Sequence, residues 1–258
     1  MIKRIIQNLV PRTILTIYKR NQYVKILKNH SIEDEPDIKI AKLLTNKKSI
    51  MVDIGSNIGL YAKYLSPLSK EVICIEPVPF TFEMLNHTVQ KFDLANVETH
   101  KLAISETSGS AEILIPIQAG VQNYYKASVE PEESHQIGLT INVITKTLDD
   151  FLERVSVPIT LIKCDVEGHE LSVLEGAEKV LKAGLAAWLI EVSGNPDDAK
   201  SRATEVLNLM QSYGFQVFWF DGNSLNERKT NDESVNYFFL KERHIKHLTD
   251  KGIQFISE

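Results

Sequence analysis

The chain has 258 residues, of which 43% are hydrophobic and 24% charged, and its formal net charge is −5. This length and composition are typical of a globular protein of one large domain, and they exclude collagen, low-complexity sequence and extensive disorder. No apolar run of about 18 residues is present, which excludes a membrane-spanning helix, and the acidic balance argues against nucleic acid as a partner. Cys74 and Cys164 lie in apolar runs, so we expect buried reduced thiols rather than a disulfide or zinc site.

The first 30 residues are basic, with seven lysines or arginines and no acidic residue. Ile2, Ile5, Ile6 and Leu9 fit one face of a short helix. We predict that residues 1–48 form a basic helical cap and that residues 49–258 form the main domain. Two roles remain open for residues 1–30, namely packing on the domain with a solvated basic face, or peripheral contact with an anionic membrane. No secretory signal is evident, so we expect a cytoplasmic protein.

From residue 49 onward, short apolar runs alternate with helical patterns. The expected strands span 49–54, 71–76, 97–105, 111–115, 141–145, 159–164, 186–192, 216–220 and 235–240. The expected helices span 58–65, 80–92, a stretch from about 148, 171–181 and 199–213. Buried strands separated by helices indicate a doubly wound α/β fold with a mostly parallel sheet. The last two strands are joined by a polar loop, 221–233, and should pair antiparallel at one edge.

One long segment, 116–138, lacks a clear period and contains Tyr124, Tyr125 and His135. In a compact domain, such a long irregular stretch is often a lid or a binding loop.

The first buried strand ends in a turn with two glycines, Asp53-Ile-Gly55-Ser-Asn57-Ile-Gly59, and the second strand ends in Glu76. In an open parallel sheet, ligands bind beyond the carboxyl ends of the strands. An acid at Glu76 is placed to accept hydrogen bonds from ribose hydroxyls. The turn has one glycine fewer than a dinucleotide site needs, and Asp53 would repel a phosphate. A sulfonium cofactor with an adenosine and an amino-acid tail suits this charge better, although a tight turn without a ligand remains open.

A second polar cluster follows the strand at 159–164, with Asp165, Glu167, His169 and Glu170 close together. The start of a helix favours the neutral, proton-accepting form of His169, although a structural role there is also open. For Glu170 we expect surface charge. Asp165, Glu167 and Glu191 offer oxygen ligands to a divalent metal, but they are too few and too generic, so we expect no metal site.

These motifs resemble the FkbM-type family of S-adenosylmethionine-dependent methyltransferases. The resemblance covers about residues 49–192 and rests on an ordered set of short motifs. They are Val-Asp-Ile-Gly-Ser-Asn-Ile-Gly (52–59), Ile-Glu-Pro (75–77), Leu-Ala-Ile-Ser (102–105), Thr-Leu-Asp-Asp (147–150) and Lys-Cys-Asp-Val-Glu-Gly-His-Glu (163–170). The resemblance implies a Rossmann-like, seven-stranded sheet with an antiparallel edge strand, the class I methyltransferase fold. It also implies methyl transfer to a hydroxyl oxygen of a sugar or small metabolite.

On this hypothesis each motif residue has an expected role. His169 is the first choice for the base that takes the hydroxyl proton, and Asp165 the second. The residues expected to bind S-adenosylmethionine are Asp53, Gly55, Asn57, Gly59, Glu76, Pro77, Ala103 and Asp165. The residues expected to shape the acceptor pocket are Tyr124, Tyr125, His135 and Glu167.

Other functions predict different sequence features. A nicotinamide-dependent dehydrogenase should have a third close glycine and no Asp53, so the sequence argues against it. Amino methylation of DNA would call for Asn-Pro-Pro-aromatic where residues 165–168 read Asp-Val-Glu-Gly. A non-catalytic S-adenosylmethionine-binding module, or a methyltransferase acting on a protein or a lipid-linked acceptor, stays open. The oligomeric state is not predicted.

Overall fold

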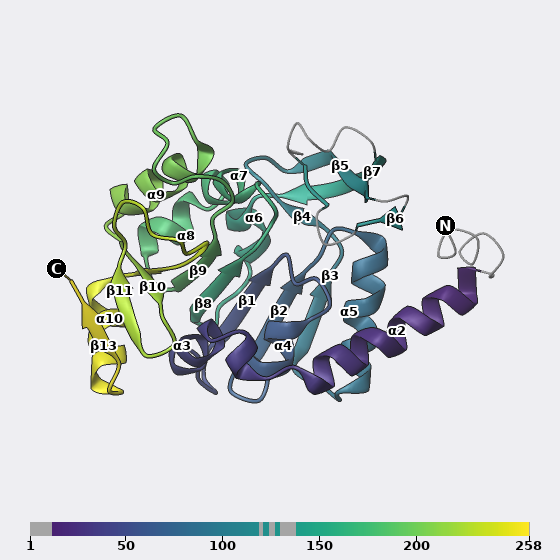
Figure 1. Cartoon of the computed structure of the whole chain (residues 1–258), viewed down its shortest axis with the longest axis horizontal. Coiled ribbons are helices and arrows are strands. Elements are labelled where there is room, and N and C mark those ends of the chain that lie inside the picture. Colours follow the sequence, from purple (N-terminus) through teal and green to yellow (C-terminus); the bar gives the residue numbers. More distant parts are fainter. Residues whose placement is uncertain (1–11, 119–120, 124–126, 130–137, 258) are drawn as a thin grey trace.

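A computed structural model describes residues 12–118, 121–123, 127–129 and 138–257 of the chain. In this part of the chain, a nine-stranded sheet lies between two layers of helices, and a smaller four-stranded sheet lies beside it (Figure 1). The strands of the large sheet, in spatial order, are β13 (Gln254–Ile256), β11 (Ser224–Glu227), β10 (Gln216–Phe220), β12 (Asn236–Leu240), β9 (Ala187–Glu191), β8 (Ile159–Cys164), β1 (Ile50–Ile54), β2 (Glu71–Ile75) and β3 (Val97–His100).

The five strands from β9 to β3 are parallel, and β12 runs antiparallel to both β9 and β10. The α/β class and the mostly parallel sheet are therefore confirmed, as is the antiparallel pairing of the strands at 216–220 and 235–240. The expected count of seven strands is too low. The polar loop expected at 221–233 contains β11, and β13 pairs with β11 beyond it, so the antiparallel pair is not the edge of the sheet.

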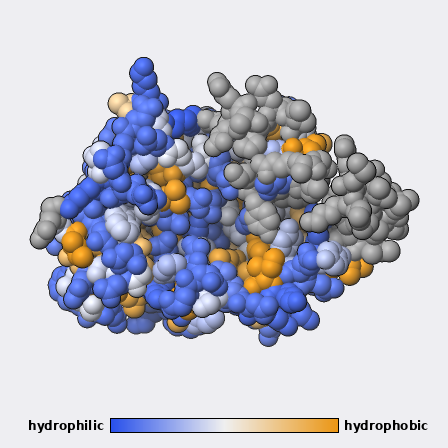
Figure 2. Space-filling model, viewed as in Figure 1, coloured by the Kyte–Doolittle hydropathy of each residue, from blue (hydrophilic) through white to orange (hydrophobic). Residues whose placement is uncertain are grey.

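Helices cover both faces of the large sheet. One face packs against α3 (Asp37–Leu44), α4 (Leu60–Leu65), α5 (Pro79–Lys91) and α10 (Glu242–Asp250). The other face packs against α6 (Leu148–Leu152), α7 (Glu170–Glu175), α8 (Glu178–Ala183) and α9 (Arg202–Ser212). Most of the surface visible in Figure 2 is hydrophilic, and its hydrophobic residues form small separate patches. The layered packing thus buries the continuous apolar runs that predicted the strands.

The single helix expected at 171–181 is in fact two short helices, α7 and α8. The break falls at Gly176, where an added Cβ would lie 2.1 Å from the backbone oxygen of Ser105. The chain therefore approaches Ser105 more closely there than a side chain would allow.

The small sheet has the order β4 (Ala103–Ile104), β7 (Gly138–Lys146), β5 (Gly109–Gln118) and β6 (Val121–Gln122). The run expected as one strand at 97–105 is divided between β3 and β4. The short strands expected at 111–115 and 141–145 belong to a long antiparallel pair, β5 and β7. On β5, the alternate residues Ile113 and Ile115 are buried and pack with Ala103 and Val143. This buried face explains why the strand pair β5 and β7 lies against the domain.

The N-terminal helix α2 (Arg12–Asn29) packs on α5 and is followed by a short 3-10 turn, η1 (Ile32–Asp34). Leu27 is buried with Ile58 and Met84, and Arg20 pairs with Glu83 on α5. No helix among the described residues is long and apolar enough to cross a membrane. Residues 1–11 lie outside the described residues, and the peripheral membrane contact left open for residues 1–30 is not tested by the structure.

Candidate active site

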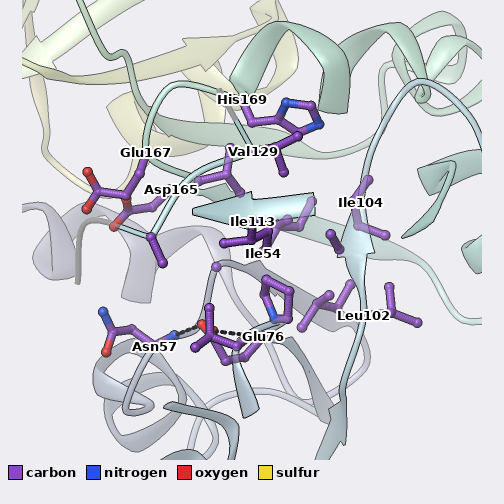
Figure 3. Close-up of a pocket in the computed structure, with 17 residues that line it drawn as sticks. Ile54, Asn57, Glu76, Leu102, Ile104, Ile113, Val129, Asp165, Glu167 and His169 are labelled. Carbon is purple, nitrogen blue, oxygen red and sulfur yellow. Dashed lines mark hydrogen bonds between the residues drawn. The ribbon is translucent and has the colours of Figure 1, made fainter. Parts of the chain in front are cut away.

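A pocket lies at the carboxyl edge of the parallel strands, which we call the first pocket (Figure 3). The segments that follow β1, β2 and β8 contribute Asn57, Glu76 and Asp165 to it, and Ala103 lies on β4. The small sheet contributes Ile113 of β5. Ala127 and Val129, from the segment between β6 and β7, also line the pocket. Residues from six separate stretches of sequence therefore meet where an open α/β sheet binds its ligands.

The glycine turn after β1 is held in a conformation that suits glycine. Gly55 has φ +79°, and an added Cβ would lie only 1.7 Å from the backbone oxygen of Asp165. Gly59 has φ +86°, and its Cβ would lie 2.9 Å from the end of Leu85 on α5. Asn57, between them, also has a positive φ, 49°. The two glycines thus let the β1 turn lie directly against the β8 turn and against α5.

Glu76 is a buried carboxylate that lines the first pocket. Its Oε1 accepts hydrogen bonds from the Val78 N–H (2.9 Å) and the Thr81 hydroxyl (2.8 Å). Its Oε2 accepts from the Asn57 N–H at 3.0 Å, the contact marked in Figure 3. Burial raises the pKa of Glu76, and these hydrogen bonds oppose the rise. A carboxylate has about four acceptor positions, so about one remains on Oε2 for a ligand.

Asp53, at the end of β1, is 2% exposed and lines a second pocket on the other side of the glycine turn. Its Oδ2 atom is buried without a hydrogen-bond partner among the described residues, and so is Oδ1 of Asn57. Burial raises the pKa of Asp53 to about 7, although Lys163 opposes the rise. These two oxygens are acceptors that still lack a donor, and a buried acceptor without a donor is costly.

Asp165 lines both pockets, and its side chain is 30% exposed. Its Oδ2 accepts a hydrogen bond from Nζ of the buried Lys163 at 3.0 Å. Burial lowers the pKa of Lys163, but Asp165 and Asp53 raise it by more, so the lysine stays charged. Its Nζ also lies 4.9 Å from the centre of the Tyr61 ring. Lys163 thus holds the Asp165 carboxylate in one orientation between the two pockets.

His169 caps the start of α7 and lines the first pocket, but its side chain is only 5% exposed. Its Nε2 lies 2.9 Å from the hydroxyl oxygen of Ser105, and that hydroxyl donates to Glu106 at 2.6 Å. Because Ser105 has a single hydroxyl proton, this arrangement requires Nε2 of His169 to carry the donated proton. The hydrogen bond from Ser105 lowers the pKa of Glu106.

One expectation for the residues after β8 is wrong. Glu170 is 3% exposed and accepts a hydrogen bond from the Gly168 N–H at 2.9 Å, so it closes the turn and is not a surface charge. No three His, Cys, Asp or Glu side chains among the described residues are placed to hold a metal ion. Asp165, Glu167 and Glu191 therefore form no such group. Glu167 lines the first pocket, and its backbone oxygen accepts from the Ser128 hydroxyl at 2.6 Å.

Most of the expected site residues meet in one region. The structure brings Gly55, Asn57, Glu76, Pro77, Ala103, Asp165, Glu167 and His169 into the first pocket. Tyr124, Tyr125 and His135 lie outside the described residues, so their role in the acceptor pocket stays a prediction. Sequence reasoning did not single out Ser105 or Lys163. A lysine inside an otherwise apolar strand was the available signal for Lys163, because a buried lysine needs a partner.

The chain matches the family described as the methyltransferase FkbM domain over residues 53–217. It is 26% identical over 186 residues to "Methyltransferase 1" of Beauveria bassiana, covering 66% of this chain and 73% of that protein. It is 29% identical over 137 residues to the hexuronic acid methyltransferase AglP of Haloferax volcanii, covering 52% of each chain. Among solved structures, methyltransferase FkbM of Methylobacillus flagellatus superposes with a TM-score of 0.49 at 18% identity, over 76% of this chain and 44% of the other. The chain thus spans about half the length of some of its relatives.

Proposed function

The chain belongs to the family of FkbM-domain methyltransferases, and from this premise we propose that it methylates a hydroxyl oxygen of a sugar or other small metabolite with S-adenosylmethionine. The observation that carries the proposal is the pocket at the carboxyl edge, where the glycine turn, Glu76 and Asp165 meet. The similarity to the hexuronic acid methyltransferase AglP supports a sugar as the class of acceptor.

The residues of the pocket fit this cofactor. The remaining acceptor position on Oε2 of Glu76 suits one ribose hydroxyl. Pro77 and Ala103 line the same pocket and leave an apolar surface for a flat base. On the other side of Gly55, the unpartnered Oδ2 of Asp53 and Oδ1 of Asn57 can accept hydrogen bonds from an ammonium group. The two ends of the cofactor thus find acceptors on either side of the glycine turn, where a side chain at Gly55 would clash with the β8 turn.

When bound, S-adenosylmethionine supplies a methyl carbon on a positively charged sulfur, and its S–C bond breaks as the new O–C bond forms. An alcohol is a poor nucleophile at neutral pH, so a group that takes its proton should speed the step. We assign that role to Asp165, because it lines both pockets and its side chain is partly exposed. Lys163 donates a hydrogen bond to the Asp165 carboxylate and so keeps it oriented to take the proton. His169, the first choice from sequence, becomes the second, because it is deeply buried and bonded to Ser105.

The test is an incubation of the purified protein with S-adenosylmethionine and a panel of sugars and small hydroxylated metabolites. Release of S-adenosylhomocysteine that depends on one of these acceptors would support the proposal, and it should fall in the Asp165→Asn variant. An exposed carboxylate on α9, Glu205, offers a matched control, Glu205→Gln, which should leave the rate unchanged. Binding of S-adenosylhomocysteine without turnover on any acceptor of the panel would contradict the proposed reaction and favour a non-catalytic binding module.

A further inference from the structure

The second pocket, which contains Asp53, takes part of its lining from outside the matched range 53–217. Leu27, near the end of α2, and Glu35, just after η1, both line it. We call residues 27–35 the cap segment. The pocket that is to receive the amino-acid end of the cofactor therefore has one wall that does not belong to the matched domain.

The cap segment packs directly on the glycine turn. Leu27 is 1% exposed and lies in one apolar cluster with Ile58 of the turn and Met84 of α5. Burying an aliphatic side chain in this way typically contributes about 1.5–3 kcal/mol. The cap segment thus helps to hold the glycine turn against α5.

The helix α4 begins straight after the glycine turn and fastens the cap segment with polar contacts. Nζ of Lys63 donates a hydrogen bond to the backbone oxygen of Leu27. The hydroxyl of Tyr64 donates to the backbone oxygen of His30 at 2.6 Å. The cap segment, the glycine turn and α4 therefore form one connected unit, which fixes the segment in the wall of the second pocket.

Glu35 is the acidic side chain that the cap segment contributes to the pocket. The hydroxyl of Tyr61, on α4, donates a hydrogen bond to its Oε1 at 3.1 Å. Its Oε2 accepts no hydrogen bond, and the carboxylate makes no ion pair, within the part of the chain that the structure describes. Burial raises the pKa of Tyr61, and the nearby charges of Glu35, Asp37 and Asp53 raise it further. Tyr61 thus orients Glu35 in the same acidic surroundings as Asp53 and leaves one of its oxygens available.

The number of donors on an ammonium group gives that oxygen a role. The group has three N–H donors. Two buried oxygens beside the glycine turn, Oδ2 of Asp53 and Oδ1 of Asn57, lack a donor among the described residues. The third donor needs another acceptor, and Oε2 of Glu35 is one in the same pocket.

Other acceptors of the second pocket are farther from the glycine turn or already paired. Glu191 and Asn236 belong to β9 and β12, the second and third strands from β1 in the sheet. Because neighbouring strands lie about 4.8 Å apart, they are roughly 10 and 14 Å from the end of β1. Asp165 already accepts a hydrogen bond from Lys163. Glu35, in contrast, is tied through Tyr61 to the helix that follows the turn.

We propose that the cap segment closes the amino-acid end of the cofactor site and that Glu35 binds the ammonium group of the cofactor together with Asp53 and Asn57. The inference rests on the proposed function and adds a cofactor-binding residue from outside the matched domain. A half-buried carboxylate without a cation is stabilised when a cationic group binds beside it, so Glu35 adds affinity for the amine in particular.

The test is calorimetry on the full chain with three ligands that share the adenosine. S-adenosylhomocysteine carries an amine and a carboxylate, its decarboxylated analogue keeps only the amine, and methylthioadenosine has neither. Glu35→Gln removes the charge but keeps an oxygen for Tyr61. It should weaken binding of the two amine ligands about tenfold, because a charged acceptor is lost, and leave methylthioadenosine unchanged. In the matched control Glu33→Gln, the affinities for all three ligands should stay the same, because the Glu33 side chain is 74% exposed and pairs with Lys39.

The outcomes separate this inference from the proposed function. If the unaltered protein does not bind S-adenosylhomocysteine, the proposed function itself fails. If it does bind, unchanged affinities for the amine ligands in Glu35→Gln would overturn the role of Glu35. An equal loss for all three ligands would also overturn it, because the effect would then be structural. A loss confined to S-adenosylhomocysteine would place Glu35 near the carboxylate of the ligand and would overturn it too.

Discussion

Replacing Gly55 by alanine tests the close contact between the β1 turn and the β8 turn. The new Cβ would lie 1.7 Å from the backbone oxygen of Asp165, so one of the two turns must move. The left-handed backbone, φ +79°, costs an alanine roughly 1–2 kcal/mol. Forcing a methyl group into a packed site typically costs roughly 1–3 kcal/mol more. We therefore expect Gly55→Ala to lose about 2–5 kcal/mol of unfolding free energy.

The matched control is Gly214→Ala, at the end of α9. Gly214 has nearly the same backbone angle, φ +78°, but nothing lies within 4 Å of its Cβ position. It should lose only the backbone part, about 1–2 kcal/mol. Urea unfolding of both variants at 25 °C measures the difference. Gly55→Ala should also bind S-adenosylhomocysteine more weakly, whereas Gly214→Ala should not. Equal losses of stability in the two variants, with equal affinities, would refute the close approach of the two turns.

Three further predictions concern single carboxylates. Glu76→Gln should weaken S-adenosylhomocysteine binding about tenfold in calorimetry, because a charged acceptor becomes neutral; an unchanged affinity would remove Glu76 from the cofactor site. Asp165→Asn should lower kcat by about 10²–10⁴-fold and leave the cofactor affinity unchanged, because the group that takes the hydroxyl proton is lost. His169→Asn should lower kcat by a smaller factor. A larger loss of kcat in His169→Asn than in Asp165→Asn would make His169 the base. The pKa of Asp53 is about 7 when folded and about 3.9 when unfolded. The folded state therefore binds the extra proton, and its stability should fall as pH rises from about 4 to 7. Asp53→Asn should flatten that slope in urea unfolding at several pH values, and an unchanged slope would contradict the assignment.

The sequence predicts those parts of the fold that depend on a local pattern of residues. The apolar runs at β1, β2, β8 and β9 are continuous because both faces of these strands are buried. Asp53, Glu76 and Asp165 each follow such a run, so the shared edge of a parallel sheet brings them together without any long-range information. This is why most of the expected site residues lie in one region.

The features that the sequence did not predict depend on contacts between distant segments. β11 lies in a polar stretch, and only its pairing with β10 and β13 makes it a strand. Gly176 breaks a helical pattern because Ser105, 71 positions earlier in the chain, lies against it. Glu170 looks like a surface charge at a helix start, but the turn at Gly168 folds back onto it. No periodic pattern in the sequence indicates these contacts between distant segments.

The second pocket was also not predicted, because its residues come from α2, the segment after η1, α4 and the ends of four strands, β1, β8, β9 and β12. Asp53 and Asp165 belong to two of the sequence motifs, but Glu35, Glu191 and Asn236 belong to none. Glu35 lies in the region that the sequence assigns to a helical cap. Acceptor binding was expected from Glu167 and from the segment at 116–138. Ala127 and Val129, two described residues of that segment, line the first pocket, as does Ile113.

The central claim is that the pocket at the carboxyl edge holds S-adenosylmethionine across the glycine turn, and a crystal structure of the protein with S-adenosylhomocysteine tests it most directly. We expect the ribose at Oε2 of Glu76, the base beside Ala103, and the ammonium group within hydrogen-bond distance of Asp53 or Asn57. A ligand bound elsewhere, with Glu76 and Asp53 making no contact with it, would contradict the account.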